Sequence, residues 1–197
     1  MSSEREVLDL LASRYTQRRA GAIADRWVRA EHVRATQGYY SRVADFVAVD
    51  KWQSSQAMHG HEVKVSRADW LTELRDPEKA DPVKRFCHHW WLVVPDATIV
   101  KPGELPEDWG LLVQTKSGLR AKVKAPPLDP EPLTLDFVAG LATAVQRTAH
   151  REPLHHDAAT VWLGDWVRSC GSCGEPGPCQ IHQPRETEAR RLHEETP

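Results

Sequence analysis

The chain has 197 residues, of which 40% are apolar and 27% charged, and its formal net charge at pH 7 is −2. This length and balance predict one ordinary domain with its own hydrophobic core, and they exclude a disordered chain and a globally basic nucleic-acid-binding protein. No run of about 18 uncharged apolar residues occurs, and the charged N-terminus lacks the apolar core of a secretion signal. We therefore expect a cytoplasmic protein without a membrane partner.

The order of predicted elements indicates the fold class. Ser3 and Glu6 have capping-box spacing at the start of a first helix, and Ser66 is a good N-cap for a second. Periodicity predicts, in chain order, a helix over 4–18, strands over 26–34, 41–50 and 59–65, helices over 67–75 and 78–89, strands over 90–95, 110–115 and 119–124, and helices over 134–149 and 157–168. This order is typical of an α/β or α+β fold.

An acidic pair and a lysine are the first candidates for chemistry. Asp45 lies in an otherwise apolar strand, where a carboxylate is costly unless it is paired or ligated. Glu62 and Lys64 share one face of another predicted strand, and Gly60 on that face would leave room for a ligand or backbone. Two converging carboxylates suit Mg²⁺ or Mn²⁺, and the lysine could orient or help deprotonate a water, or neutralise a transition state. The alternative is a structural ion pair at a sheet edge.

The segment VADFVAVD…GHEVKVSRADWLTELRDPEKADPVKRFCHHWWLVVP resembles the PD-(D/E)XK nuclease superfamily, most closely its RecB-like and MmcB-like DNA-repair members. The resemblance covers about residues 41–113. It implies a mixed central sheet flanked by helices, with the core of a restriction endonuclease. It also implies that Asp45 and Glu62 are Mg²⁺ or Mn²⁺ ligands and that Asp45, Glu62 and Lys64 form the catalytic set.

The resemblance implies a metal-dependent nuclease that hydrolyses phosphodiester bonds of DNA in repair, recombination or phage-type DNA processing. The residue before Asp45 is Ala44, whereas the name PD-(D/E)XK has proline at that position. Many members also use an acidic residue of the first helix, and the helix pattern does not choose between Glu4 and Glu6. The alternative function is a catalytically silent nucleic-acid-binding or adaptor protein with the same fold.

Four potential metal ligands lie close together near the C-terminus. The spacing Cys170-x2-Cys173-x5-Cys179-x2-His182, with interleaved glycines, predicts a tetrahedral Cys3His zinc site. Some RecB-like nucleases instead use C-x2-C-x5-C and a distant cysteine to hold a [4Fe–4S] cluster, and Cys87 would be that fourth ligand here. In the family the distant cysteine precedes the nuclease motif, whereas Cys87 follows it. The local set of four therefore favours zinc.

The chain is expected to contain three parts: a nuclease-like domain over 1–168, a metal knuckle over 169–184 and a charged tail over 185–197. Within the first part, Lys116 lies at a predicted turn and Arg120, Lys122 and Lys124 follow on one face of a strand. Residues 116–124 contain no acid, which predicts a surface for nucleic-acid phosphates. The alternative is a solvated strand face whose lysines protect a sheet edge.

Overall fold

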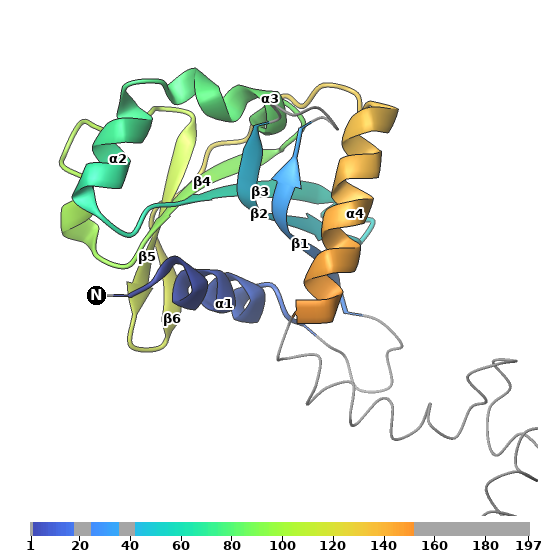
Figure 1. Cartoon of the computed structure of the whole chain (residues 1–197), viewed down its shortest axis with the longest axis horizontal. Coiled ribbons are helices and arrows are strands. Elements are labelled where there is room, and N and C mark those ends of the chain that lie inside the picture. The colour runs from blue at the N-terminus through green and yellow to red at the C-terminus, as the bar shows by residue number, and fades with distance from the viewer. Residues whose placement is uncertain (1, 18–24, 36–41, 152–197) are drawn as a thin grey trace, which may run out of the picture. The chain divides into compact units, whose positions relative to one another are not determined.

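The computed structural model describes residues 2–17, 25–35 and 42–151. These residues form a mixed α/β fold around a six-stranded open sheet (Figure 1). The strands, which lie in the sheet in chain order, are β1 (Trp27–Arg34), β2 (Val43–Asp50), β3 (Ala57–Val63), β4 (His89–Val94), β5 (Trp109–Thr115) and β6 (Gly118–Val123). The α-helices are α1 (Glu4–Arg14), α2 (Arg67–Leu74), α3 (Asp81–Lys84) and α4 (Leu135–Arg151), and the 3₁₀ turns are η1 (Pro77–Ala80) and η2 (Ala97–Ile99).

Strand directions bring distant parts of the sequence to one end of the sheet. The pairs β1–β2, β2–β3 and β5–β6 are antiparallel, whereas β3–β4 and β4–β5 are parallel. Parallel neighbours need crossover connections, and α2, η1 and α3 provide the one between β3 and β4. The carboxyl ends of β1, β3, β4 and β5 therefore lie at the same end as the amino ends of β2 and β6.

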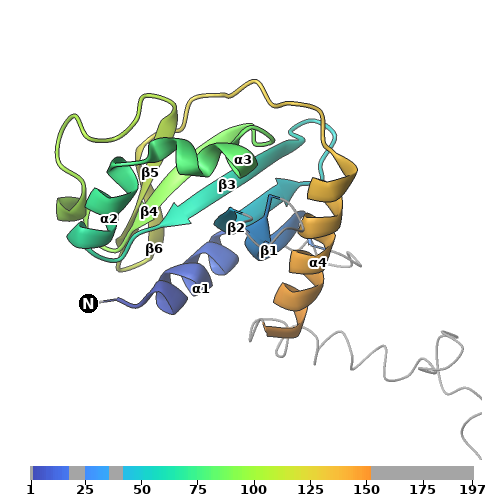
Figure 2. The ribbon, with the colours of Figure 1, turned by 45° about the horizontal axis from the view of Figure 1, so that its top comes forward.

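Helices cover both faces of the sheet. On one face, α1 packs Val7, Leu8 and Leu11 against a cluster that includes Phe46 and Leu112. On the other face, α2, α3 and α4 enclose a second cluster, and Figure 2 shows α1 and α2 on opposite sides of the strands. The tryptophans Trp70, Trp90, Trp91 and Trp109 are all buried and form part of these two clusters.

Local signals located most elements correctly. The capping box of α1 is present in full, and the Ser66 hydroxyl accepts a hydrogen bond from Asp69 N at the start of α2. The helix expected over 78–89 forms only in part, because η1 and the four-residue α3 end at Lys84. His88 N donates to Met58 O at 2.8 Å, so pairing with the neighbouring segment overrides helix propensity before the chain enters β4. The helix predicted over 157–168, the knuckle and the tail lie outside the described residues.

Candidate functional site

The candidate site lies where β2 and β3 separate. The antiparallel ladder ends with Phe46 opposite His61, and continuing this register places Asp45 opposite Glu62. At that point Asp45 Oδ2 accepts a hydrogen bond from Val63 N at 2.7 Å. Burial raises the pKa of Asp45, although the Val63 hydrogen bond opposes this shift. The two acidic residues predicted to act together therefore lie side by side, on strands that diverge.

Lys64 is held between two carboxylates. Its Nζ lies 2.5 Å from Glu62 Oε1 and 3.0 Å from Glu73 Oε2, and Glu73 is a buried residue of α2. Burial alone would lower the pKa of Lys64, but Glu62 and Glu73 outweigh it and raise the pKa overall. Lys64 therefore acts as a fixed positive charge and hydrogen-bond donor. A role as general base is disfavoured.

Glu62 has an unusually high proton affinity for a carboxylate. Burial, together with the charge of Asp45, raises the pKa of Glu62 to about 8 despite the ion pair with Lys64. Glu73 contributes a third carboxylate, which also forms an ion pair with the more distant Lys79, at 3.6 Å. The carboxylates gathered around Lys64 thus disfavour one another's charged forms, and a bound cation would relieve this repulsion.

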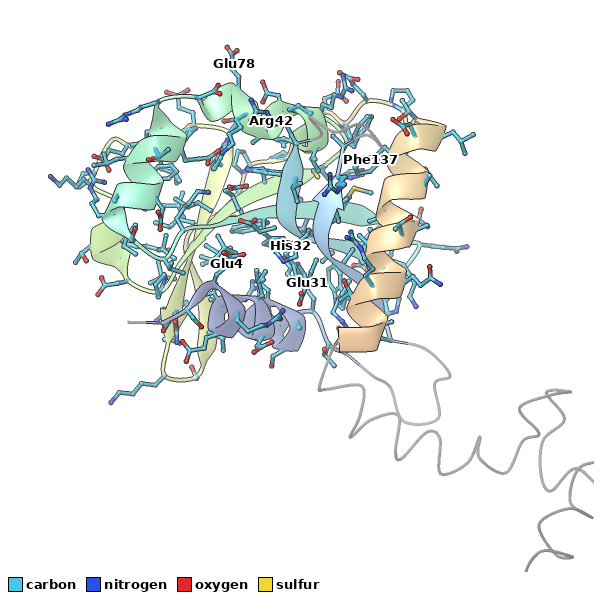
Figure 3. The ribbon with its side chains drawn as sticks, viewed as in Figure 1. Glu4, Glu31, His32, Arg42, Glu78 and Phe137 are labelled. Carbon is cyan, nitrogen blue, oxygen red and sulfur yellow. The ribbon has the colours of Figure 1, made fainter. Side chains whose placement is uncertain are left out.

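A second group of ligand atoms adjoins Asp45. One ligand atom each of Glu4, His32 and Asp45 lies within 4.8 Å of the others. Figure 3 shows Glu4, on the first turn of α1, and His32, on β1, directed toward the same region of the sheet. Glu6 has a different role, because its Oε2 accepts from Ser3 N at 2.7 Å and closes the capping box. The structure therefore identifies Glu4, and not Glu6, as the acidic residue of α1 that faces the site, a choice that the sequence pattern left open.

His32 is a site residue that sequence reasoning missed. It is the only non-glycine with a positive φ (52°) among the residues that the structure describes. The β1–β2 ladder passes from Glu31 opposite Phe46 to Val33 opposite Ala44, and His32 has no partner in it. Such left-handed backbone is costly and persists where surrounding contacts hold it. This conformation directs the imidazole toward Asp45.

Contacts from α1 and α4 hold this part of β1. From α4, Arg147 Nη2 donates to His32 O at 3.3 Å, and Thr148 Oγ1 accepts from Glu31 N at 2.8 Å. From α1, the Arg5 guanidinium donates twice to the Glu31 carboxylate, at 2.6 and 2.7 Å. Because Arg5 adjoins Glu4, this bidentate pair fixes the first turn of α1 against the strand that carries His32.

The predicted metal pair is therefore divided between two neighbouring groups. Asp45 belongs to the Glu4–His32 group, whereas Glu62 is bound to Lys64. Two carboxylates and one imidazole form a donor set that suits a divalent ion such as Mg²⁺ or Mn²⁺, with the imidazole favouring Mn²⁺. The burial that raises the pKa of Asp45 would be offset by such an ion, so the residues fit a cation.

Gly60 does not leave room for a ligand, contrary to the prediction. A Cβ atom at this position would lie 2.2 Å from Trp90 Cζ3 and 2.9 Å from Cys87 Sγ, so the indole and thiol already occupy the space. Cys87 is fully buried, and burial raises the pKa of its thiol. An iron–sulfur cluster would need this group as a thiolate, which burial disfavours. Cys170, Cys173, Cys179 and His182 lie outside the described residues.

The predicted phosphate-binding stripe is exposed but is split by a bulge. Between Leu111 opposite Val123 and Leu112 opposite Ala121 the register shifts by one residue, so Lys122 is an extra residue in β6. Beyond the bulge, the side chains of β6 alternate between the two faces in the opposite order. Lys124 consequently falls on the opposite face from Arg120. Lys116, Arg120, Lys122 and Lys124 are all exposed.

Comparisons with known proteins assign no function to these residues. No protein-family model and no curated protein matches the chain. A similar solved structure is the SPO1766 protein of unknown function from Silicibacter pomeroyi, with 20% identity, coverage of 74% of this chain and 84% of that one, and a TM-score of 0.41. None of the helices among the described residues is long and apolar enough to span a membrane.

Proposed function

We propose that the protein is a divalent-cation-dependent nuclease that hydrolyses phosphodiester bonds of DNA. The observation that carries this proposal is the juxtaposition of two groups. Glu4, His32 and Asp45 bring three ligand atoms within 4.8 Å of one another. Beside them, Lys64 is held as a partly buried, charged donor by Glu62 and Glu73. A cation site next to a fixed ammonium group suits attack at a phosphate, where negative charge must be neutralised.

Each residue has a distinct role in this proposal. Glu4, His32 and Asp45 would hold Mg²⁺ or Mn²⁺, which when bound supplies positive charge for a phosphate oxygen and for the charge that develops during hydrolysis. Lys64 donates a hydrogen bond to Oε1 of Glu62. The other carboxylate oxygen of Glu62 would then be available to bind the cation. Lys64 orients the attacking water or donates to the phosphoryl oxygen.

The fold supports the proposal without deciding it. A helix, three antiparallel strands, a helical crossover and a parallel strand follow one another. This order is consistent with the restriction-endonuclease-like core that the resemblance implies, and the candidate site lies where two of these strands diverge. The proposal includes a cytoplasmic DNA-processing role and a zinc knuckle over 169–184. The alternative of a silent binding or adaptor protein is disfavoured by the presence of Asp45, Glu62 and Lys64 together.

Cleavage of labelled single- and double-stranded DNA tests the proposal. We expect cleavage in Mg²⁺ or Mn²⁺, none in EDTA, and a loss of at least about 100-fold in Lys64→Ala, the effect of removing one transition-state donor. Glu4→Gln should lose activity, whereas Glu6→Gln, which alters the capping carboxylate of the same helical turn, is the matched control. Full activity after removal of divalent cations would refute the proposal. DNA binding without cleavage in either metal would favour the adaptor function.

A binding measurement tests the ligand set separately. Mn²⁺ bound to the protein should show nitrogen coupling in its electron paramagnetic resonance spectrum, because His32 supplies an imidazole ligand. His32→Asn should remove this coupling, and Asp45→Asn should weaken Mn²⁺ binding. Unchanged nitrogen coupling in His32→Asn would remove His32 from the proposed site.

A further inference from the structure

The hairpin of β5 and β6 forms a groove that the proposed cleavage chemistry does not use. The groove has a volume of about 370 Å³ and is lined by Val113, Thr115, Arg120, Ala121 and Lys122. Val113 gives it an apolar floor, whereas Arg120 and Lys122 give it a cationic rim. The bulge at Lys122 explains why three consecutive residues of β6 line one groove, since a bulge bends a strand and redirects its side chains.

The cations of the groove are free of ion pairs. Several basic residues elsewhere in the fold pair with carboxylates, as Lys84 does with Asp108 at 2.8 Å. Arg120 and Lys122 take part in no ion pair within the part of the chain that the structure describes. Hydrogen bonds from Thr98 N and Oγ1, both at 2.8 Å, lower the pKa of Asp96, and the charge of Lys122 contributes to this shift. Asp96 does not form an ion pair with Lys122. Positive charge at the groove is therefore available to an anionic ligand.

The sheet register relates the groove to the candidate site. Lys64 N donates to Val93 O at 3.0 Å, Val94 lies opposite Val113, and Val113 lies opposite Arg120. A path from Lys64 to Arg120 thus crosses three strand spacings, or about 14 Å. Val113 packs against the same core cluster as α2, so the groove and the Lys64–Glu73 pair share one face of the sheet. One continuous ligand strand could contact both.

We propose that this groove binds the sugar–phosphate backbone of the DNA strand to one side of the bond that is cut, about four nucleotides away for a duplex whose axis runs parallel to this path, given about 3.4 Å of helix axis per nucleotide. This inference rests on the proposed function and deepens it. The Arg120 guanidinium donates to a phosphate through two N–H groups and Lys122 acts as a point charge. The Thr115 hydroxyl lines the groove but already donates its proton to Gly118 O at 2.9 Å. The apolar floor contacts deoxyribose. No group in the groove reads a base edge, so binding there is independent of sequence.

Neighbouring lysines on opposite faces of one strand provide a matched test. Lys122→Gln removes a charge from the groove, and Lys124→Gln removes the same charge from the other face. Binding of a duplex of about 24 base pairs is measured against salt in a Lys64→Ala background, and the removal of each phosphate-binding cation should reduce the slope of log K by about 0.9. Lys122→Gln should weaken binding about fivefold at 0.15 M salt and Arg120→Gln/Lys122→Gln about 30-fold. The double control Lys124→Gln/Lys51→Gln, in which Lys51 is an exposed residue directly after β2, should approach the parent.

A small substrate separates this inference from the proposed function. Bis(p-nitrophenyl) phosphate is too short to reach the groove, so the Arg120→Gln/Lys122→Gln variant with Lys64 intact should hydrolyse it at the wild-type rate. Equal salt slopes for the groove variant and its control would overturn the groove assignment while leaving cleavage in place. Loss of hydrolysis of the small substrate in the groove variant would also overturn it, because the residues would then belong to the reaction site. A wild-type protein that neither binds nor cleaves DNA would overturn both proposals.

Discussion

Deleting the Arg5 guanidinium should cost far more stability than deleting the exposed carboxylate beside it. Arg5 has two acidic partners: Asp9, one turn away, whose side chain is 47% exposed, and Glu31, whose side chain is 2% exposed. Exposed pairs at this helical spacing contribute about 0.3–0.5 kcal/mol, whereas breaking a buried pair costs about 3–5 kcal/mol because a buried charge is left uncompensated. Since water reaches part of Arg5, we expect the lower end of that range, about 3 kcal/mol for Arg5→Ala against about 0.4 kcal/mol for Asp9→Ala.

Equilibrium denaturation of a double-mutant cycle measures this difference. Arg5→Ala, Glu31→Gln and the double variant isolate the pair, and Asp9→Ala is the control. The double variant should recover stability relative to Arg5→Ala, because the buried charge has then been removed. Arg5→Ala should also lower Mn²⁺ affinity about 10- to 100-fold, the usual effect of losing a group that orients a ligand. Equal denaturation midpoints for Arg5→Ala and Asp9→Ala would refute the reasoning.

Three further predictions concern the core, acid stability and the C-terminal metal. Gly60→Ala should destabilise the protein by about 1–3 kcal/mol, because its methyl group would overlap an indole; wild-type stability on denaturation would show that the indole can move. Burial lowers the pKa of His59 to about 4, so between pH 6.5 and 4 the unfolded chain binds a proton on this residue and the folded chain does not. The free energy of unfolding should therefore fall by on the order of 3 kcal/mol as the pH is lowered from 6.5 to 4. His59→Gln should flatten this pH dependence by about one proton, and an unchanged slope would exclude His59 as its source. The protein should contain about one zinc per chain, lost in His182→Ala and kept in Cys87→Ser; a brown protein that Cys87→Ser bleaches would identify an iron–sulfur cluster.

The parts of the site that depend on neighbouring residues in the sequence could be predicted. Asp45 was expected within a strand over 41–50, and β2 covers Val43–Asp50. Glu62 was expected on the next strand, and alternation correctly placed it on the same face as Lys64. That α2 packs on this face was learned from the structure. These predictions succeeded because an apolar strand pattern fixes the face of every side chain once the period is known.

The parts that depend on distant contacts could not be predicted. The imidazole of His32 joins the site through a left-handed backbone conformation that residues of α4 help to hold, and no pattern within β1 encodes it. Glu4 and Glu6 are both acidic residues of a first helical turn, and only the docking of α1 by Arg5 onto Glu31 shows which faces the sheet. The bulge at Lys122 likewise has no glycine or other local signal.

The strand order has a consequence for the way in which the protein is assembled during synthesis. Because spatial neighbours in the sheet are also neighbours along the chain, each new strand can pair with one already made as it leaves the ribosome. The hydrogen bonds between α4 and β1 instead join residues that are 115 and 117 positions apart in the sequence. The backbone at His32 is therefore held in place only after almost all of the described chain has emerged. We expect pulse-labelled amides of β3 and β4 to become protected before the amide of Glu31. Simultaneous protection would show that the last helix and the sheet form in a single step.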